Sequence, residues 1–415
     1  MKTRGESVKA ILVGASYHHM NYDLDISMNE LKELAKACDI EVKGVVIQNL
    51  EQVTPQYYIG KGKVDEIKKL LNEDDLVIFN EELTPLQVKN LTDVLDVEVS
   101  DRSDLILRIF ESRAQSKEAK LQVQIARLQY LLPRLAGMKV ELYSQQGGSG
   151  FRGSGEKQIE LDRRIIHRQL VQARRELQMI VKQRQTQRQL RKRNNQKVVC
   201  LVGYTNSGKS SLLNYFVNKK VFQKDMLFAS LQTASRKVKL LGHYSIIMSD
   251  TVGFINQLPH HLVQAFRSTL EEVKEADLLV HVIDSSSPYC QTQIETTLHV
   301  LEQLGVKDTP MIYVYNKVDL GYRPFLEFQT PYVLTSIKEQ AGLQQLEELI
   351  VSILFKDYEL IELIIPYDQG IIFQEIKQKY QMLREEYLDN GIYISFYTSL
   401  KDKHRYLPYR YKRIN

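Results

Sequence analysis

The chain has no tryptophan, only three cysteines in 415 residues, and no apolar run long enough to cross a membrane. A membrane-spanning helix needs about 20 consecutive apolar residues, and the N-terminus also lacks the long apolar core of a secretory signal. Cys38, Cys200 and Cys290 lie far apart and form no C-x-x-C pair. This spacing argues against a zinc ribbon or a disulfide framework and fits a reducing compartment. We therefore expect a cytoplasmic protein without a membrane span.

Enough apolar residues are present for several folded domains. Hydrophobic residues make up 43% of the chain, which argues against global disorder, and the length suggests about three domains. The net charge of +5 is uneven, because residues 152–193 carry 13 Lys/Arg against 4 Asp/Glu. A cationic segment on an acidic body favours a polyanion such as nucleic acid. For an isolated basic run, however, a solvated helix face is the simpler alternative.

Residues 1–112 alternate between apolar runs and amphipathic stretches, which predicts a small α/β domain with a parallel sheet. The stretch from Gly60 to Lys63 is rich in glycine and lysine and precedes a helical pattern, so a phosphate site is conceivable there. A glycine turn is the simpler interpretation, because no strand directly precedes it. The expected strands are Val8–Val13, Glu41–Gln48, Leu76–Phe79 and Val97–Val99, and the expected helices are Met28–Cys38, Val64–Leu71 and Thr84–Leu95.

Residues 113–195 predict two long antiparallel helices joined by a loop. Asp101 can cap a short helix that precedes them, Ser103–Arg113. Apolar residues then recur at helical spacing from Ala119 to Leu132, and Pro133 is expected to kink or end this helix. The second long helix is expected from Glu156 to about Asn194.

Residues 144–155 form the predicted loop, with five glycines in twelve residues. Phe151 and Arg152 lie at its centre, and the helix that follows continues the positive charge. A flexible backbone with an aromatic ring and arginines suits irregular RNA, where bases are unstacked. A flexible linker is an equally weighted alternative.

The segment from Gly203 to Ser210 has the pattern G-x-x-x-x-G-K-S, which predicts a phosphate-binding loop. The apolar run Val198–Val202 predicts the strand that leads into it, and Ser210–Phe216 predicts the helix that follows. Glycines let backbone N–H groups close around phosphate oxygens, and the helix N-terminus adds partial positive charge. Lys209 can reach the β- and γ-phosphates, and the Ser210 hydroxyl can ligate Mg²⁺.

A second motif follows the predicted strand Tyr244–Ser249. It consists of Asp250, Thr251, Val252 and Gly253. A carboxylate at this position can hold Mg²⁺ through water, and the glycine N–H can meet the γ-phosphate.

A third motif follows the predicted strand Met311–Tyr315. The carboxylate of Asp319 can accept hydrogen bonds from guanine, whereas adenine presents the opposite pattern. A short segment after the strand Tyr332–Leu334 can cover the base. Because the three motifs occur in order at strand ends within residues 196–356, they predict a GTPase domain. The residues of this base-binding part are Asn316, Lys317, Val318, Asp319, Ser336, Ile337 and Lys338.

Between the first and second motifs, the hydroxyl of one serine or threonine side chain should bind Mg²⁺ when the γ-phosphate is present. Ser230, Thr233 and Ser235 are candidates, and spacing does not choose among them. Phe254 follows Gly253, at a position where many GTPases carry a glutamine that orients water. A phenyl ring cannot orient water by hydrogen bonding, so we expect slow intrinsic hydrolysis that a partner accelerates.

Residues 357–415 predict a small α/β module in the order strand, helix, strand. The expected elements are Glu359–Ile365, Ile372–Tyr387 and Gly391–Thr398, and the helix Leu343–Leu354 precedes them. Tyrosines alternate with cations in the tail, Lys403–Arg413, which suits RNA or ribosomal protein. A disordered tail is the alternative.

Taken together, these residues resemble the HflX family of translation-associated GTPases, over nearly the whole chain. The resemblance is carried by all three nucleotide motifs and by several stretches outside them. These are Tyr58–Val64, Leu76–Phe79, Lys120–Val123, Leu132–Leu135, Gln146–Gly148, Arg152–Gly153, Gly155–Glu156, Asp162–Arg164 and Leu227–Ala229.

The resemblance implies an α/β multidomain protein, in which a small α/β subdomain and a helical hairpin precede the GTPase domain and a small α/β domain follows it. It implies that the protein binds GTP and GDP, binds the large ribosomal subunit and splits stalled or stressed 70S ribosomes, with hydrolysis timing its release. The alternative is a GTP-dependent large-subunit assembly or binding factor without splitting activity. An RNA-remodelling ATPase is disfavoured by Asp319. The loop departs from the family pattern at Phe151, Ser154 and Lys157.

The resemblance also assigns residues to the site. It places the switch Mg²⁺ ligand at Ser230, which joins Ser210 as a metal ligand, and it gives Lys209 and Gly253 catalytic roles. Contacts to ribosomal RNA are expected from Phe151, Arg152, Lys157, Arg163 and Arg164. Further GTP contacts are expected from Gly203, Tyr204, Thr205, Asn206, Ser207, Gly208, Phe228, Ala229, Leu231, Gln232, Asp250, Thr251 and Val252.

Asn206 carries a separate hypothesis. Some related GTPases use an asparagine here to bind K⁺ against the phosphates, while a turn-forming asparagine is the plainer interpretation. We expect a monomer in the cytoplasm, with peripheral membrane association through ribosomes as an open alternative.

Overall fold

The structure is a computed structural model, and it describes residues 8–17, 23–137, 152–193, 196–217, 234–255, 272–306, 308–321 and 327–411. Contacts divide the chain into two compact units. One contains residues 1–182, 224–232 and 252–269, and the other contains residues 183–223, 233–251 and 270–415. The finer division at residues 112, 195 and 356 stays a prediction.

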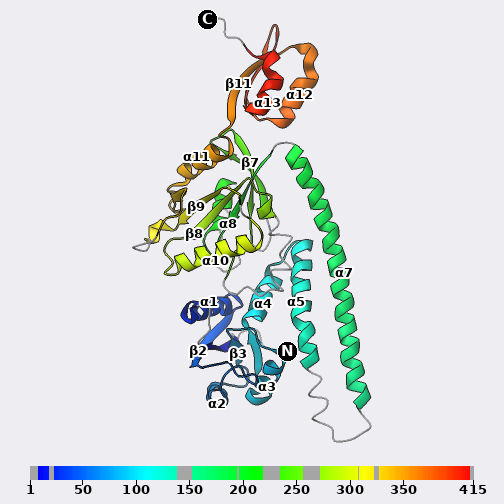
Figure 1. Cartoon of the computed structure of the whole chain (residues 1–415), viewed down its shortest axis with the longest axis vertical. Coiled ribbons are helices and arrows are strands. Elements are labelled where there is room, and N and C mark those ends of the chain that lie inside the picture. Colours follow the sequence, from blue (N-terminus) through cyan, green and yellow to red (C-terminus); the bar gives the residue numbers. More distant parts are fainter. Residues whose placement is uncertain are drawn as a thin grey trace. The chain divides into compact units, whose positions relative to one another are not determined.

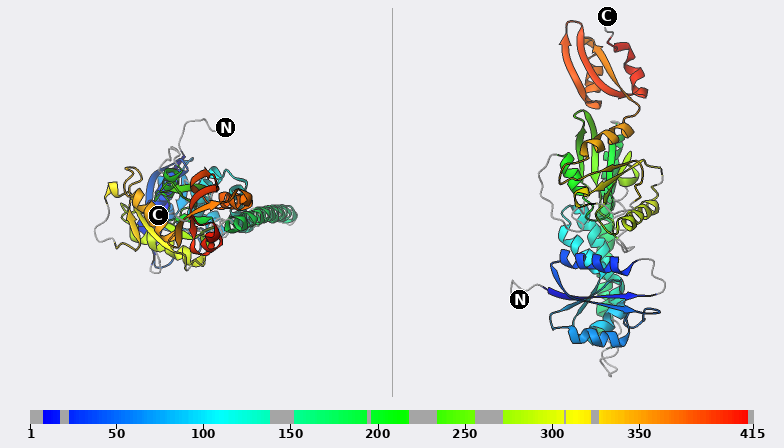
Figure 2. Two further views of the ribbon diagram at one scale, coloured as in Figure 1. Left: turned by 90° about the horizontal axis from the view of Figure 1, so that it is seen from above. Right: turned by 90° about the vertical axis from the view of Figure 1, so that its left-hand side faces the viewer.

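The first unit begins with a four-stranded parallel sheet, which confirms the predicted α/β domain. The strands β1 (Val8–Ser16), β2 (Ile40–Asn49), β3 (Leu76–Phe79) and β4 (Glu98–Asp101) lie in the order β2-β1-β3-β4. Leu12 pairs with Ile78 across β1 and β3. Helices cover both faces of this sheet (Figure 2, right). They are α1 (Leu24–Ala37), α2 (Lys61–Leu70), α3 (Pro85–Leu95) and α4 (Arg102–Arg113).

Two long helices follow, α5 (Lys117–Gly137) in the first unit and α7 (Arg152–Arg193), whose residues from 183 on belong to the second unit (Figure 1). Leu121 and Ile125 of α5 pack against Ala173 of α7, with Leu177 and Ile180 beside them. Of the two outcomes expected at Pro133, an end of the helix is wrong, because α5 continues to Gly137, and a kink stays a prediction. The second long helix begins earlier than expected, because residues 152–155 belong to α7.

The second unit contains a six-stranded sheet in the order β10-β9-β8-β5-β7-β6. Its strands are β5 (Lys197–Val202), β6 (Ala234–Leu240), β7 (Tyr244–Asp250), β8 (Leu278–Asp284), β9 (Met311–Asn316) and β10 (Tyr332–Leu334). Only β6 is antiparallel to its neighbour. The helices are α8 (Lys209–Phe216), α10 (Cys290–Gln303) and α11 (Leu343–Leu354).

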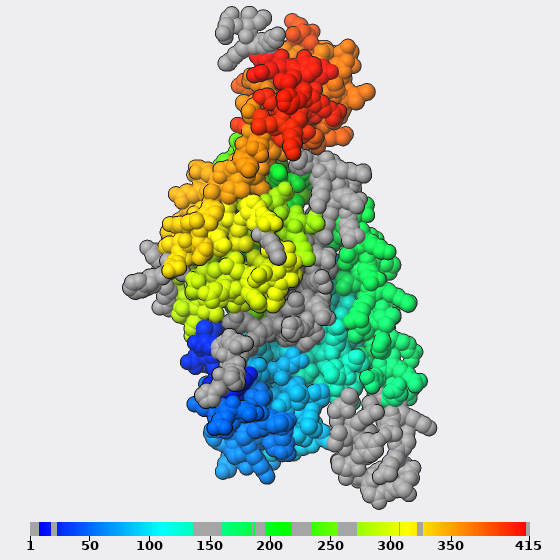
Figure 3. Space-filling view, in the orientation of Figure 1, coloured from blue at the N-terminus to red at the C-terminus, as the bar shows by residue number. Residues whose placement is uncertain are grey.

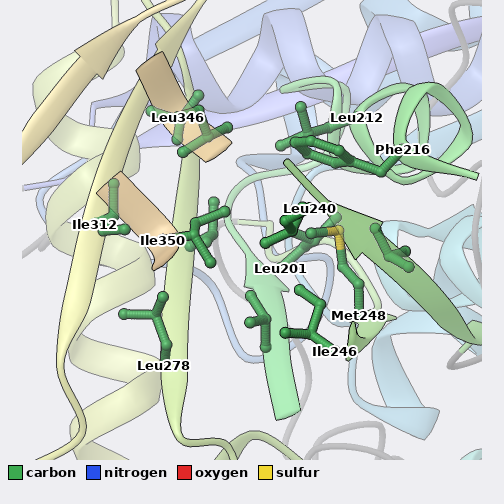
Figure 4. Close-up of a cluster of buried hydrophobic side chains, with 14 of the residues drawn as sticks. Leu201, Leu212, Phe216, Leu240, Ile246, Met248, Leu278, Ile312, Leu346 and Ile350 are labelled. Atoms are coloured by element: carbon green, nitrogen blue, oxygen red, sulfur yellow. The ribbon is translucent and has the colours of Figure 1, made fainter. Parts of the chain in front are cut away.

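Apolar side chains from both edges of this sheet meet beneath α8 and α11 in one core (Figure 4). Leu201 of β5, Met248 of β7 and Ile350 of α11 are completely buried in it. The pattern explains why β5 and β8 read as continuous apolar runs, since central parallel strands are covered on both faces. The core fixes the carboxyl ends of β5, β7 and β9 at one edge, where the predicted motifs begin.

The C-terminal part corrects one prediction. The helix expected over Ile372–Tyr387 is two elements, α12 (Gly370–Lys379) and the strand β12 (Met382–Leu388). β12 forms an antiparallel hairpin with β13 (Gly391–Ser399), and β13 also pairs with β11 (Tyr358–Ile365). Tertiary pairing therefore outweighs the helical spacing of residues 382–387, and the Asn390-Gly391 turn is the sequence signal for this hairpin.

The basic tail is folded onto this module. Helix α13 (Leu400–Tyr406) buries Tyr406 in the core, and Tyr411 N–H donates to the Glu362 carbonyl at 2.8 Å. The tail cations Lys403 and Arg405 pair with carboxylates of β11 and α12. The interpretation of this tail as disordered is wrong for residues 400–411. Among all the described residues, no helix is long and apolar enough to span a membrane.

Candidate functional site

The predicted phosphate loop connects β5 to α8, as its sequence requires. Gly203 and Gly208 have φ angles of +144° and +103°. A Cβ atom on Gly203 would lie 2.2 Å from the Val282 carbonyl oxygen, and one on Gly208 would lie 2.3 Å from Nδ2 of Asn316. Both positions therefore require glycine for backbone conformation and for space. The loop closes tightly over the end of the sheet, with the N-terminus of α8 directed into it.

Lys209 begins α8 and is almost completely buried. Its Nζ donates to the carbonyl oxygens of Gly203 at 3.0 Å and Tyr204 at 2.6 Å. Burial lowers the pKa of this ammonium group to about 8, and the charge of Asp250 opposes the shift. The lysine is held inside its own loop by carbonyl contacts, which it can exchange for phosphate oxygens.

Ser210 and Asp250 bring a hydroxyl and a carboxylate together from α8 and β7. The Ser210 Oγ donates to Oδ2 of Asp250 at 2.5 Å. Mg²⁺ prefers such oxygen ligands and is usually bound by one or two protein groups together with phosphates, so these residues fit this ion. Thr251 is bonded differently, because its hydroxyl donates to the Leu201 carbonyl at 2.7 Å and fixes the end of β7 to β5.

The base-binding motif lies at the ends of β9 and β10. Asn316 is buried, and its Nδ2 donates to the carbonyl of Ser207 at 2.9 Å, which ties this motif to the phosphate loop. The backbone N–H of Ile337 donates to Oδ1 of Asn316 at 3.3 Å. Ser336 Oγ donates to Oδ1 of Asp319 at 2.7 Å. One Asp319 oxygen is thus oriented by the serine, while Lys338 is exposed.

Three residues in the middle of the phosphate loop differ in exposure. Thr205 and Ser207 are buried, and neither hydroxyl has a hydrogen-bond partner within the described part of the chain. Asn206 is exposed and has a φ of +62°. Asparagine tolerates this left-handed conformation better than most residues, so the turn alone accounts for its presence.

Two residues at this edge of the sheet were missed by the sequence analysis. Asp284 ends β8, and its Oδ2 pairs with Nζ of Lys317 at 2.8 Å. His281 on the same strand is buried, and burial together with the charge of Lys209 lowers its pKa to about 3. The signal was available, since Leu278–Asp284 is an apolar strand that ends in a carboxylate, like β7.

The remaining predicted residues have different outcomes. Phe228, Ala229, Ser230, Leu231, Gln232 and Thr233 lie outside the described residues. Ser235 lies in β6, where its hydroxyl shares a 2.8 Å hydrogen bond with Ser249. Val252, Gly253 and Phe254 follow β7 and are buried.

The predicted RNA contacts belong to the first unit. Phe151 lies outside the described residues, as do the side chains of Arg152 and Lys157. Arg163 and Arg164 are exposed on α7, where they line a surface groove with His167, Arg168 and Arg175. The helix repeat places Arg164, Arg168 and Arg175 opposite the stripe that packs on α5, with Arg163 and His167 at the side of that face. Figure 3 shows the long surface of α7 in green.

Comparison with family models divides the chain into three matched regions. Residues 25–111 match a family described as GTP-binding GTPase N-terminal, and residues 113–191 match GTP-binding GTPase Middle Region. Residues 198–317 match a family described as 50S ribosome-binding GTPase. The three nucleotide motifs all begin within this third region, and the base-covering segment lies beyond it.

Similar proteins extend over nearly the full length. GTPase HflX of Caldanaerobacter subterraneus subsp. tengcongensis is 44% identical over 91% of this chain and 89% of its own. GTPase HflX of Alkalihalophilus pseudofirmus is 40% identical over 95% of this chain and 96% of its own. A GTP-binding protein from Sulfolobus solfataricus, solved in complex with GDP, aligns over 84% of this chain and 99% of its own, with 24% identity and a TM-score of 0.45.

Proposed function

Because the chain belongs to the HflX family of GTPases, we propose that it binds the large ribosomal subunit and splits stalled or stressed 70S ribosomes. GTP hydrolysis would time its release from the subunit. The observation that supports the chemistry best is the cluster of Lys209, Ser210, Asp250, Asn316 and Asp319 at one edge of the six-stranded sheet.

The nucleotide contacts follow from this cluster. Backbone N–H groups of residues 203–210 would surround the phosphates, and Lys209 would bind the β- and γ-phosphates. Ser210 would ligate Mg²⁺ directly and Asp250 through water, with Ser230 as the proposed second protein ligand. When bound, this ion neutralises charge on the β- and γ-phosphate oxygens. Asp319 would accept from the guanine N1–H and amino group, which selects GTP over ATP.

Hydrolysis should be slow without a partner. Phe254 is buried next to Gly253 and cannot hydrogen-bond to the attacking water. We propose that the large subunit supplies or orders the groups that complete the site. Turnover measured with and without 50S subunits tests this directly, and fast hydrolysis in their absence would contradict it.

The ribosome-facing part of the proposal is supported by α7. Its exposed face carries Arg163, Arg164, Arg168 and Arg175 without an equal number of acids. Neighbouring arginines suit the phosphate backbone of ribosomal RNA. We propose that this face binds ribosomal RNA and that residues 144–155 insert into that RNA. Neutralising Arg163 and Arg168 together should weaken 50S binding and reduce its dependence on salt concentration.

Sucrose-gradient sedimentation of 70S ribosomes tests the splitting activity. With a non-hydrolysable GTP analogue, we expect the protein to convert 70S particles into subunits and to stay on the large one. A variant lacking residues 144–151 should bind nucleotide normally but leave 70S particles intact. If the deletion variant splits ribosomes as well as the full chain does, residues 144–151 are not the acting element.

The alternative is a large-subunit assembly or binding factor. It predicts that the protein co-sediments with 50S subunits in the same gradients while 70S particles persist. ATP hydrolysis at the efficiency of GTP hydrolysis would instead indicate an RNA-remodelling ATPase.

Asn206 allows a limited proposal about K⁺. Its amide oxygen is exposed in the phosphate loop and could ligate a monovalent cation, although its backbone conformation already explains the residue. Faster turnover in KCl than in NaCl would assign the ligand role. Equal rates would leave only the conformational role.

A further inference from the structure

A buried carboxylate connects the N-terminal sheet to the end of helix α5. Asp101 is the last residue of β4, and none of its surface is exposed. Its Oδ1 accepts from the Asp104 backbone at 3.0 Å and from the Tyr130 hydroxyl at 3.0 Å. Its Oδ2 accepts from the Leu83 backbone at 3.2 Å and from Arg134 at 2.7 Å. Two of these four donors are side chains of α5.

Arg134 makes a matching set of contacts from the last turn of α5. Besides Asp101, its guanidinium donates to the carbonyl oxygens of Leu83 at 3.1 Å and Tyr130 at 3.0 Å. Its Cζ lies 3.4 Å from the centre of the Tyr130 ring. A planar, forked cation suits such a combined site, because it can donate in two directions while stacking on a ring.

Arg134 lies in a turn of α5 that is weakly held by backbone hydrogen bonds. Pro133 precedes it inside α5. Proline has no N–H group, and its ring crowds the carbonyl of residue i−4, so the turn that contains it is weakly held by the backbone. The Arg134 side chain holds the same turn to β4 and to the segment after β3. The position of this last turn of α5 is therefore set by side-chain contacts.

We propose that Arg134 and Asp101 are positioning residues that fix the last turn of α5, from which the chain continues to residues 144–155. This proposal rests on the proposed function, in which those residues act on the ribosome. A pair that served stability alone would gain little from being charged, because apolar residues often replace a buried ion pair without loss. A forked ion pair, by contrast, fixes one geometry.

Arg127 provides a matched control on the same helix. It pairs with Asp104 of α4, a buried carboxylate one turn beyond Asp101. It lies before Pro133, however, where the backbone ladder of α5 is unbroken. Arg127→Met should therefore destabilise the protein less than Arg134→Met does, because Arg108 still pairs with Asp104. It should not loosen the last turn of the helix.

The test compares Arg134→Met, Arg134→Lys and Arg127→Met in the full-length protein with 70S ribosomes. Small misplacements at an acting group cost up to about 100-fold in rate, so we expect Arg134→Met to lower the splitting rate at least tenfold. The 50S concentration for half-maximal GTPase stimulation should change less than threefold, since α7 is intact. Arg134→Lys should recover part of the rate, and basal GTPase activity should stay unchanged in all three.

Equal losses of splitting in Arg134→Met and Arg127→Met, in proportion to their thermal midpoints, would overturn the proposal. A second readout does not depend on ribosomes. Chymotrypsin can cleave after Tyr143 and Phe151 in the sequence, and loosening of the last α5 turn should change the cleavage rate at these sites about fivefold in Arg134→Met only. Unchanged cleavage would also refute the positioning role. If the unaltered protein fails to split ribosomes while the cleavage difference is present, the proposed function fails and the positioning role stands.

Discussion

The two parallel sheets of this chain use their carboxyl ends in opposite ways. In the N-terminal sheet, the polar residues at the strand ends bond to side chains of the covering helices: Asn80 to Ser27 of α1, and Asp101 to Tyr130 and Arg134 of α5. At the six-stranded sheet, the described part of the chain holds Lys209 by carbonyls of its own loop, and within the same part the hydroxyls of Thr205 and Ser207 have no partner.

The difference separates a structural junction from a binding site. Buried charges that are fully bonded within the protein have their desolvation offset by their partners, and removing one partner leaves the other uncompensated. Buried polar groups whose bonds are incomplete or exchangeable are costly for folding but ready for a ligand. Substitutions at the first sheet should therefore change stability, and substitutions at the second should change nucleotide binding.

The largest effect is expected at Asp101. Asp101→Ala should lower the free energy of unfolding of the first unit by about 3–5 kcal/mol, because Arg134 is left without its counter-charge. Urea unfolding followed by circular dichroism measures this. Replacing both partners, Asp101→Leu with Arg134→Met, should recover much of the loss. If Asp101→Ala lost GTP affinity at a temperature where it is folded, the separation of a structural sheet from a nucleotide-binding sheet would be contradicted.

Lys209→Ala should lower nucleotide affinity without lowering stability, the reverse of Asp101→Ala. Removing a charged donor to phosphate oxygens costs about 3 kcal/mol, or roughly 100-fold in GTP affinity. The thermal midpoint should not fall, because burying this ammonium opposes folding. Fluorescence titration with a labelled GTP and a melting curve without nucleotide measure the two quantities. A clear fall in the midpoint would assign the lysine a structural role.

The strand ends were the most predictable part of the chain. A buried parallel strand is a continuous apolar run, and the motif residues begin where that run stops, as at Asp250 and Asn316. The parallel N-terminal sheet, the cap of α4 at Asp101 and the helix Leu343–Leu354 are confirmed on the same grounds.

The errors arose where distant contacts override local pattern. Residues 382–387 have helical spacing but pair with β13. Pro133 lacks a backbone donor, yet the helix continues where Arg134 bonds to Asp101. The ion pair of Asp284 with Lys317 joins two strand ends. Nothing in the spacing along one chain gives these partners, because each depends on which strands become neighbours.

A smaller effect should show that Lys209 exchanges its carbonyl contacts for phosphate oxygens when nucleotide binds. Its pKa is about 8 because of burial, and phosphate oxygens beside it would favour the charged form and raise that pKa. Nucleotide binding should therefore take up roughly half a proton at pH 8 and about a tenth at pH 7. Calorimetry in buffers of different ionisation enthalpy measures the uptake. No uptake at pH 8 would mean that Lys209 is already fully charged.

The smallest effect is expected in the folded tail. Arg405 pairs with Glu375 at 2.6 Å on the surface. Exposed ion pairs contribute at most about 1 kcal/mol, so Arg405→Ala should barely change stability. Because this charge already has a partner, 50S affinity should also stay within about twofold. A tenfold loss of 50S binding would restore the tail as an RNA contact.

The central claim is that a guanine nucleotide at the second sheet drives an action on ribosomes, and a change of base tests it most directly. Asp319→Asn exchanges an acceptor for a donor, which should shift preference from guanine to xanthine, whose carbonyl replaces the amino group. In sucrose gradients, we expect the unaltered protein to split 70S ribosomes with a non-hydrolysable GTP analogue only, and Asp319→Asn to do so with the xanthosine analogue only. Splitting by the unaltered protein that is independent of the nucleotide supplied would contradict the account.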